Sequence, residues 1–398
     1  GINATVPSSS SASGDPTDNN GHGTHVSGII GAVGNDGKGI TGIAWKVQLM
    51  ELKFLDSTGG GSVSDGIACI DYAITHGASI INASYGSPSY SASEFAAIQQ
   101  ARDAGIIFVT AAGNDGLNVD HGNDYPAGYA LDNVVTVAAT TSTDALASYS
   151  DYGPGSVDLG APGDQILSTY NTSDTAHVIA SGTSMAAPHV VGALALLRAH
   201  FPSDTYRQLI NRLLRSTTAL PGLSGKVQSG GRLNLAAALS STTNRPFNDD
   251  FASRAVLTGA NVRVRSSNAG ATLESGEPSI SGVSGGASLW WTWTAPATGQ
   301  VLFTTAGSGY DTAIAVYTGT SLSTLQLMAA NDDASATDTT SSVTVNATAG
   351  TVFQIAVEGK GGASGFTSLK IGAVPPNDNF ANAQVVTGRS FAVKATNL

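Results

Sequence analysis

The residues best suited to chemistry are a histidine, an asparagine and a serine, each set among small residues. His22 lies within Asn-Gly-His-Gly-Thr-His-Val-Ser-Gly, Asn114 follows Thr-Ala-Ala-Gly, and Ser184 lies within Gly-Thr-Ser-Met-Ala-Ala-Pro-His-Val. A serine hydroxyl needs a base to take its proton before it attacks a carbonyl carbon, and neutral imidazole suits that task near pH 7. Small neighbours let a substrate backbone approach closely. The three residues therefore predict nucleophilic acyl transfer.

Alternating strands and helices are expected to position these residues. Short β-branched apolar runs are typical of parallel strands covered on both faces. They occupy residues 47–55, 79–84, 106–110 and 134–137. Helical patterns occupy residues 22–33, 63–76, 91–104, 184–200, 203–216 and 233–239. Ser184 would open the longest helix, where the positive field and a free N–H group favour a developing oxyanion.

The motif around His22, then Asn114, then the motif around Ser184 follow one another along the chain. In wording and order they resemble those of the subtilisin-like serine proteases (subtilases), and the resemblance covers roughly residues 1–240. The resemblance implies a three-layer α/β domain with a parallel sheet. It also implies that His22 is the general base, Ser184 the nucleophile and Asn114 the side-chain donor of the oxyanion hole. The substrate, a protein or peptide, would be bound by Ala83, Ser84, Tyr85 and Gly86, by a facing edge strand of Gly59, Gly60 and Gly61, and by Ala111, Ala112 and Gly113.

The third member of the family's triad, an aspartate, has no obvious place in this chain. Asp18 precedes His22 by four residues, where the family often has an aspartate that is not catalytic. The opening Gly1-Ile2-Asn3 resembles the residues that follow the catalytic Asp-Ser or Asp-Thr, so we expect that aspartate just upstream of Gly1. The chain as given would then have at most trace activity. The alternative is a non-catalytic binding or scaffold protein built on an inactive protease domain.

No cofactor is required for this chemistry, but the resemblance makes structural calcium a candidate. Asn35 and Asp36 lie where the family often has a calcium loop, and their oxygens suit a hard cation. A second candidate is the Asn-Asp-Asp sequence at residues 331–333. Two other carboxylates, Asp115 and Asp124, are either solvated loop residues or lie near the primary specificity pocket, where they would favour basic substrate side chains.

The sequence changes character after residue 240. Residues 241–247 are expected to be a linker, and residues 248–374 alternate in short runs broken by Gly, Asn and Asp, which is typical of an all-β sandwich. This part resembles the jelly-roll-like modules of secreted bacterial peptidases, and it would bind a surface, a polysaccharide or a protein. Residues 375–388 match 246–259 at eight of fourteen positions, so 375–398 are expected to begin a second copy.

Composition excludes several classes of protein. The 398 residues carry 18 Lys and Arg against 29 Asp and Glu, a net charge of −11, which disfavours binding to nucleic acid or anionic membranes. No apolar run is long enough to span a membrane. The resemblance implies a secreted or cell-surface bacterial protein, with a signal peptide that is not in this chain. The one cysteine, Cys69, is expected to be a buried structural thiol.

Overall fold

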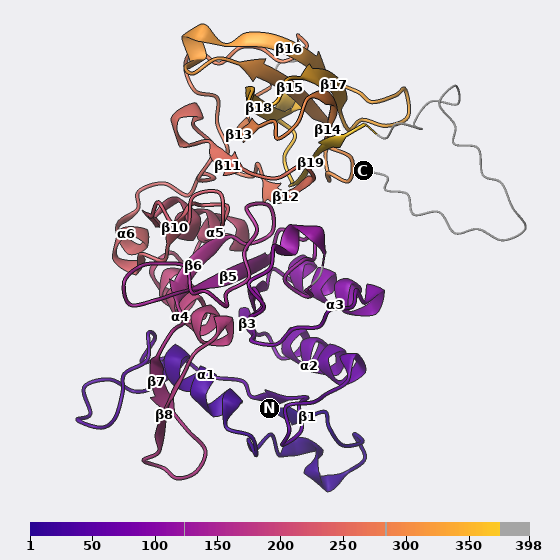
Figure 1. Cartoon of the computed structure of the whole chain (residues 1–398). Coiled ribbons are helices and arrows are strands. Elements are labelled where there is room, and N and C mark those ends of the chain that lie inside the picture. Colours follow the sequence, from indigo (N-terminus) through magenta and orange to yellow (C-terminus); the bar gives the residue numbers. More distant parts are fainter. Residues whose placement is uncertain (123, 283–284, 375–398) are drawn as a thin grey trace, which may run out of the picture. The chain divides into compact units, whose positions relative to one another are not determined.

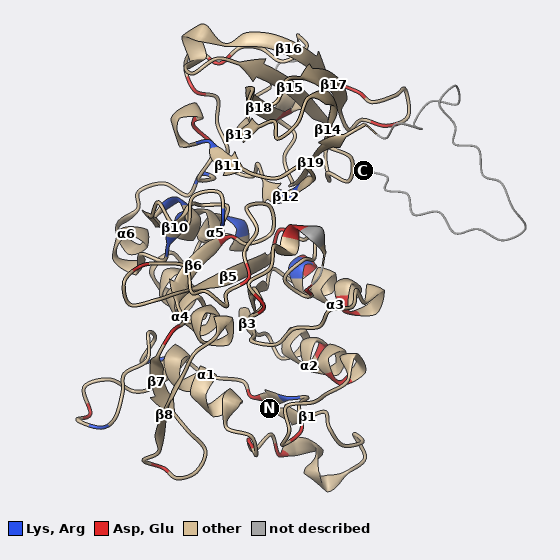
Figure 2. Cartoon of the chain, viewed as in Figure 1, with Lys and Arg blue, Asp and Glu red and all other residues tan. Residues whose placement is uncertain are grey.

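The computed structural model describes residues 1–122, 124–282 and 285–374 (Figure 1). It divides the chain into two units, Gly1–Phe247 and Asn248–Leu398. The predicted second copy, residues 375–398, lies outside the described residues. Few segments in Figure 2 are coloured for charge, in keeping with the 12% of charged residues in the sequence.

The first unit is built on a six-stranded sheet in the order β3-β4-β5-β6-β10-β9. Its strands pair in parallel except for β9, which is antiparallel to β10. The strands are β3 (Ile80–Ala83), β4 (Ile107–Ala111), β5 (Val134–Thr140), β6 (Leu159–Pro162), β9 (Thr218–Ala219) and β10 (Gly231–Arg232). Every residue of β4 and β5 is buried, as expected for central strands covered on both sides.

Helices cover both faces of this sheet, so the unit has three layers. They are α1 (His22–Gly31), α2 (Val63–Thr75), α3 (Ala92–Asp103), α4 (Thr183–His200), α5 (Tyr206–Arg215) and α6 (Leu235–Ser240). Val109 faces a core shared with α1, α4 and α5, whereas its neighbour Phe108 faces a core shared with α2 and α3. The period of two along β4 thus assigns successive side chains to opposite layers.

Some of the predicted strands are wrong in extent. Only Leu52–Lys53 (β2) of residues 47–55 is a strand, and it pairs in parallel with Ile2–Asn3 (β1) in a separate two-stranded sheet. Its length is limited because β1 is its one strand partner in the described part of the chain. The sequence patterns also missed an antiparallel hairpin, β7 (Ile166–Thr169) and β8 (His177–Ala180), which leads into α4.

The second unit consists of strands and short 3₁₀ turns in its described part. One sheet has the order β11-β13-β18-β15-β16 and the other β12-β19-β14-β17. The strands are β11 (Ala255–Leu257), β12 (Val262–Ser267), β13 (Leu289–Thr294), β14 (Gly299–Thr304), β15 (Thr312–Thr318), β16 (Gln326–Asn331), β17 (Ser342–Ala347), β18 (Val352–Gly359) and β19 (Phe366–Ala373). Trp290, Trp291 and Trp293 of β13 are all buried, so they contribute to packing and offer no exposed face for a sugar.

Candidate active site

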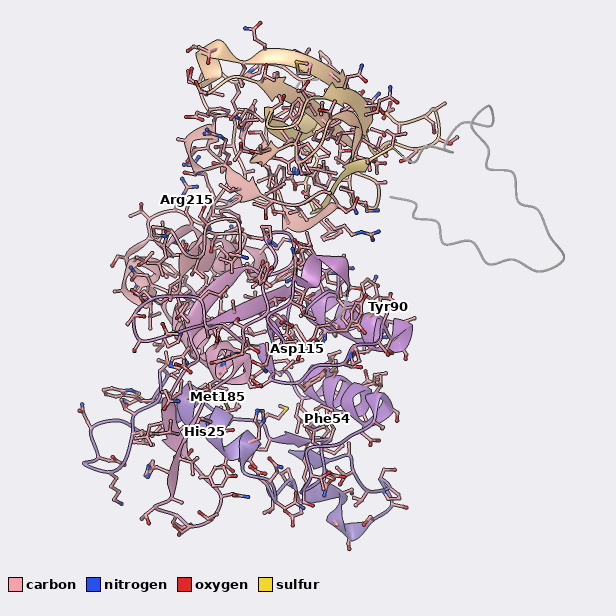
Figure 3. All side chains as sticks on the ribbon, in the orientation of Figure 1. His25, Phe54, Tyr90, Asp115, Met185 and Arg215 are labelled. Atoms are coloured by element: carbon pink, nitrogen blue, oxygen red, sulfur yellow. The ribbon has the colours of Figure 1, made fainter. Side chains whose placement is uncertain are left out.

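Ser184 lies in the first turn of α4, beside the asparagine that follows β4. Asn114 Oδ1 accepts hydrogen bonds from the backbone N–H of Thr183 at 2.9 Å and from the Thr183 hydroxyl at 3.1 Å. Because the amide oxygen is engaged in this way, the Asn114 NH₂ group is free to donate elsewhere. Figure 3 labels Met185 and Asp115, the residues that follow Ser184 and Asn114 in the chain.

Two N–H donors lie around one point next to Ser184. A Cβ placed on Gly182 would lie 3.6 Å from Asn114 Oδ1, 3.7 Å from the backbone nitrogen of Ser184 and 3.8 Å from Asn114 Nδ2. Gly182 has no side chain, so that space is left to another group. Two donors near a serine at a helix N-terminus can stabilise an oxyanion, because the charge would develop where the N–H dipoles already lie.

The serine is also held by the segment after β3. Ser84 Oγ donates to the Ser184 carbonyl oxygen at 2.9 Å, and Asn82 Nδ2 donates to Ser84 Oγ at 3.0 Å. The Ser184 hydroxyl in turn lies 3.4 Å from the Ser84 carbonyl oxygen, a long hydrogen bond. Asn82 and Thr183 therefore fix the start of α4, and sequence reasoning missed both. The Thr directly before Ser184 was visible in the motif, but its partner was not.

His22 is the first residue of α1, which packs against α4. Burial lowers the pKa of the His22 imidazole, and the neighbouring His25 acts in the same direction, while Asp18 opposes them. The ring is therefore neutral near pH 7 and able to accept a proton. In the part of the chain that the structure describes, no hydrogen bond joins His22 to Ser184.

Asp18 stabilises the start of α1 and does not contact the imidazole of His22 through a hydrogen bond. Its carboxylate accepts the N–H groups of Asn20, Gly21 and Thr24 and the Thr24 hydroxyl, at 2.7–2.9 Å. A carboxylate at this position satisfies free N–H groups at the helix N-terminus and complements the helix dipole. This agrees with the expectation that Asp18 is not the catalytic aspartate of the resemblance.

The hairpin β7–β8 holds the other side of α1. His25 lies within hydrogen-bond distance of the Val178 carbonyl oxygen (Nε2···O 3.0 Å), and the hydroxyls of Ser168 and Thr169 donate to the carbonyls of His25 and Thr24. His25 is thus a packing residue, and the hairpin fixes the helix that begins with His22. The role of β7–β8 is invisible in the sequence, because these contacts span about 150 residues.

The predicted substrate-binding segments follow adjacent strands. Ala83 ends β3 and Ala111 ends β4, so Ser84, Tyr85 and Gly86 and, on the other strand, Ala112 and Gly113 continue at the sheet edge where Ser184 lies. The Tyr85 ring contacts Phe54, with 4.8 Å between ring centroids, and its hydroxyl donates to Glu94.

Gly59, Gly60 and Gly61 are not the edge strand that was expected. They are exposed and form a turn, closed by a hydrogen bond from the Asp56 N–H to the Gly60 carbonyl oxygen and by one bridge from Gly61 to Leu55. The physical reason is local. Gly59 has φ of +83°, and the Asp56 carboxylate accepts the N–H of Gly60, which curls the chain.

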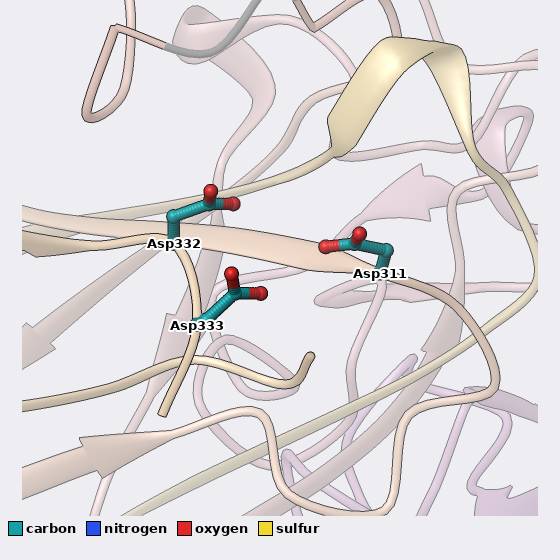
Figure 4. Close-up of side chains that lie close together, drawn as sticks. All are labelled: Asp311, Asp332 and Asp333. Carbon is teal, nitrogen blue, oxygen red and sulfur yellow. The ribbon is translucent and has the colours of Figure 1, made fainter. Parts of the chain in front are cut away.

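The calcium candidates differ in their geometry. Asn35 and Asp36 lie in an exposed turn, where Asp36 Oδ1 accepts the Lys38 N–H. Two side chains supply fewer oxygens than the six to eight that calcium takes. In the second unit, Asp311, Asp332 and Asp333 each offer an oxygen within 4.8 Å of the others (Figure 4). The ammonium of Lys360 forms ion pairs with Asp332 and Asp333, at 2.5 Å and 3.6 Å, and so already neutralises part of this cluster.

Neither of two other features points to chemistry. Cys69 is buried, and burial raises the pKa of its thiol to about 12, so it is not a nucleophile at neutral pH. Arginines gather on α5, coloured blue in Figure 2, but Arg207 pairs with Asp132 and Arg212 with Asp204.

Among the described residues, no helix is long and apolar enough to cross a membrane.

Comparison with known proteins identifies the family. The subtilase family matches residues 4–236, more than half of the chain. This chain belongs to the subtilase family. The subtilase unit carries His22, Asn114 and Ser184 on α1, after β4 and on α4.

Curated relatives match the same part of the chain. The chain is 42% identical over 210 residues to a thermostable alkaline protease of Halalkalibacterium halodurans, covering 52% of this chain and 56% of that protein. It is 40% identical over 227 residues to subtilisin Savinase of Lederbergia lenta, covering 56% of this chain and 80% of that protein. It is 40% identical over 214 residues to the minor extracellular protease Epr of Bacillus subtilis, covering 54% of this chain and 32% of that protein. The chain therefore spans little more than half the length of the first of these relatives.

Proposed function

We propose that this subtilase is a serine endopeptidase that hydrolyses peptide bonds through an acyl-enzyme. The observation that carries the proposal is that the Ser184 backbone nitrogen and Asn114 Nδ2 lie 3.7 Å and 3.8 Å from the Cβ position of Gly182, at the start of the helix that carries Ser184. The relatives named as alkaline protease and subtilisin support the same reaction.

The steps follow from these positions. Ser184 Oγ attacks the carbonyl carbon while its proton passes to His22, and the oxyanion accepts hydrogen bonds from Asn114 and from the Ser184 N–H. His22 then gives the proton to the leaving amine. A water molecule attacks the acyl-enzyme in the same manner and regenerates the Ser184 hydroxyl.

Labelling with a fluorophosphonate tests the proposal. Such a probe reacts with a serine only when a base and an oxyanion site activate it. We expect labelling at Ser184 and hydrolysis of a peptide substrate by the protein that includes the predicted aspartate upstream of Gly1, with both lost in Ser184→Ala. A folded protein that is neither labelled nor hydrolytic would instead favour the non-catalytic binding or scaffold function.

The aspartate of the triad remains a prediction. A carboxylate on Nδ1 of His22 would hold the ring in the tautomer that accepts the serine proton. The gene sequence directly upstream of the Gly1 codon tests it, since we expect codons for Asp-Ser or Asp-Thr there. A different residue at the aspartate position would contradict the predicted triad.

We also propose that the protein is secreted, that its first unit binds structural calcium, and that its second unit is an accessory binding module. The name of the relative Epr, an extracellular protease, supports secretion. Calcium bound by the turn that contains Asn35 and Asp36 would raise the melting temperature of the first unit, and a chelator would reverse this. The second unit would be a jelly-roll-like accessory module that binds a surface, a polysaccharide or a protein, but its buried tryptophans exclude a binding face built on them.

A further inference from the structure

A carboxylate lies against both segments that flank Ser184. A Cβ on Gly86 would lie 2.7 Å from Asp124 Oδ1, and a Cβ on Gly113 would lie 2.6 Å from Asp124 Oδ2. Both positions lack a side chain, so the carboxylate meets the two backbones directly. A larger residue at Gly86 would have to displace Asp124, whereas at Gly113 it would meet Asp151 Oδ2 as well as Asp124.

These two segments also contact the nucleophile. Gly86 follows Ser84, whose carbonyl oxygen lies 3.4 Å from Ser184 Oγ, and Gly113 precedes Asn114 in the chain. Gly86 is exposed and Gly113 is half-buried, so the Asp124 carboxylate lies at the boundary between the protein and the place where a substrate would bind.

Among the described residues, no cation pairs with the Asp124 carboxylate. Its Oδ1 is buried without a hydrogen-bond partner, and none of the ion pairs of the described residues includes it. Two further carboxylates are near enough to repel it, those of Asp151 and Asp115. Asp151 is 1% exposed and is oriented by the N–H groups of Asp115 and Leu117, at 3.0 Å and 2.7 Å from its Oδ1. Asp115 is exposed.

We propose that Asp124 selects lysine or arginine at the substrate residue whose carbonyl Ser184 attacks. This inference rests on the endopeptidase function proposed above. A cationic side chain reaching between the segments after β3 and β4 would supply the missing counter-charge. A neutral side chain would leave the carboxylate buried and unpaired, which costs free energy. The preference for a cationic over a neutral substrate side chain is therefore set by the charge of Asp124 and not only by the size of the site.

Two matched substrates isolate the charge. Peptides that differ only in arginine or citrulline before the cleaved bond have nearly the same shape, but citrulline is neutral. For the wild-type protein at pH 8 we expect kcat/KM to favour arginine by about tenfold or more, the range of one hydrogen bond to a charged group. In Asp124→Asn the ratio should fall to near one, because the arginine side chain no longer meets a carboxylate.

Control variants separate Asp124 from the other carboxylates. Asp71→Asn removes the same charge from the exposed face of α2 and should leave the ratio unchanged. Asp115→Asn should change it less than Asp124→Asn does, because Asp115 is exposed and screened. If Asp115→Asn abolishes the preference and Asp124→Asn does not, the assignment to Asp124 is wrong. Asp124→Ser gives a second test if Asp124→Asn does not fold.

The pH dependence provides an independent check. Burial raises the pKa of Asp124 to about 7, and Asp151 and Asp115 add to the rise, while the N–H groups of Ser87 and Tyr125 oppose it. The arginine-to-citrulline ratio should therefore increase as pH rises through about 7, when the carboxylate becomes charged. Titration of His22 affects both substrates equally and cancels in the ratio. A ratio independent of pH between 5 and 9 would contradict the proposal.

Binding of 4-aminobenzamidine, a cationic probe, distinguishes failure of this inference from failure of the proposed function. The probe needs no turnover, and its fluorescence reports transfer into a less polar site. We expect saturable binding that weakens at least about tenfold in Asp124→Asn. Absence of binding, or binding unchanged in the variant, overturns the inference even if peptides are hydrolysed. Loss of both labelling and hydrolysis, with binding retained, would overturn only the proposed function.

Discussion

At the scale of single residues, Asn114 is the side chain whose orientation matters most. Its Oδ1 is fixed by Thr183, which leaves Nδ2 for the proposed hydrogen bond to the oxyanion. We expect Asn114→Ala to lower kcat with little change in KM, because the donor acts when charge develops on the carbonyl oxygen. The magnitude is taken from subtilisin itself, where removing one such donor costs about 10²–10³ in kcat. Steady-state kinetics would measure it, and a change confined to KM would argue against the role.

Thr183 is a positioning residue for Asn114. Its hydroxyl lies within hydrogen-bond distance of Asn114 Oδ1 and of the carbonyl and N–H of Gly113, while its backbone N–H also holds Asn114. Thr183→Val keeps the shape and removes the hydroxyl, so we expect kcat to fall about tenfold. Thr183→Ser should restore most of it, since the hydroxyl returns. Equal kcat in the Val and Ser variants, at unchanged stability, would show that the hydroxyl does not position Asn114.

At the scale of elements, α1 depends on close contact with the hairpin β7–β8. A Cβ on Gly28 would collide with the hydroxyls of Ser168 and Thr169. We expect Gly28→Ala to destabilise the first unit by about 1–3 kcal/mol, as overpacking does, and to lower activity by shifting the helix that carries His22.

Gly66→Ala is the matched control for this substitution. Its Cβ would lie 3.6 Å from the ring of Phe54, in ordinary van der Waals contact, within α2. The higher helix propensity of alanine should then stabilise the unit by up to about 1 kcal/mol. Chemical denaturation measures both variants. If both shift stability in the same direction, the predicted collision at Gly28 is not what limits the packing of α1.

Strand β18 carries a buried acid that weakens the second unit at neutral pH. Glu358 is 2% exposed, and burial, aided by Glu277, raises its pKa to about 7 from 4.5. In the window from about 4.5 to 7 the unfolded chain ionises this group and the folded chain does not, so stability falls as pH rises. We expect Glu358→Gln to raise the stability of the second unit at pH 8 by on the order of 2 kcal/mol, and to change it little at pH 4.5. Thermal melts at the two pH values would test this, and a destabilised variant at pH 8 would contradict it.

At the scale of the whole molecule, the hydrophobic clusters of the described residues fall either within Gly1–Phe247 or beyond Asn248, and none of them spans both units. We expect calorimetry to resolve two unfolding transitions, because each unit buries its own apolar surface. Tryptophan fluorescence should follow mainly the second unit, since three of the four tryptophans lie buried in β13 and Trp45 is 44% exposed. A single transition seen by both methods would mean that the units unfold cooperatively.

The sequence by itself determined the family and the α/β alternation, and it predicted the residues for acyl transfer. It could do so because helix and strand periodicities and short motifs are local, and because buried parallel strands need apolar runs. The expectation of an edge strand failed at residues 59–61. There the N–H of Asp56 donates to the Gly60 carbonyl oxygen and the Asp56 carboxylate accepts the Gly60 N–H, which produces a turn.

Only the tertiary structure decided which side chains act together. Contacts between Ser84 and Ser184 span 100 residues, those between His25 and Val178 span 153, and the carboxylate of Asp124 meets glycines from two other segments. No local pattern encodes such distances, because they result from how the strands are ordered in the sheet and how helices pack on it. The motifs therefore indicated which residues could carry the proposed chemistry, whereas packing placed two N–H donors near Ser184 and, in the described part of the chain, left Asp124 Oδ1 buried without a hydrogen-bond partner.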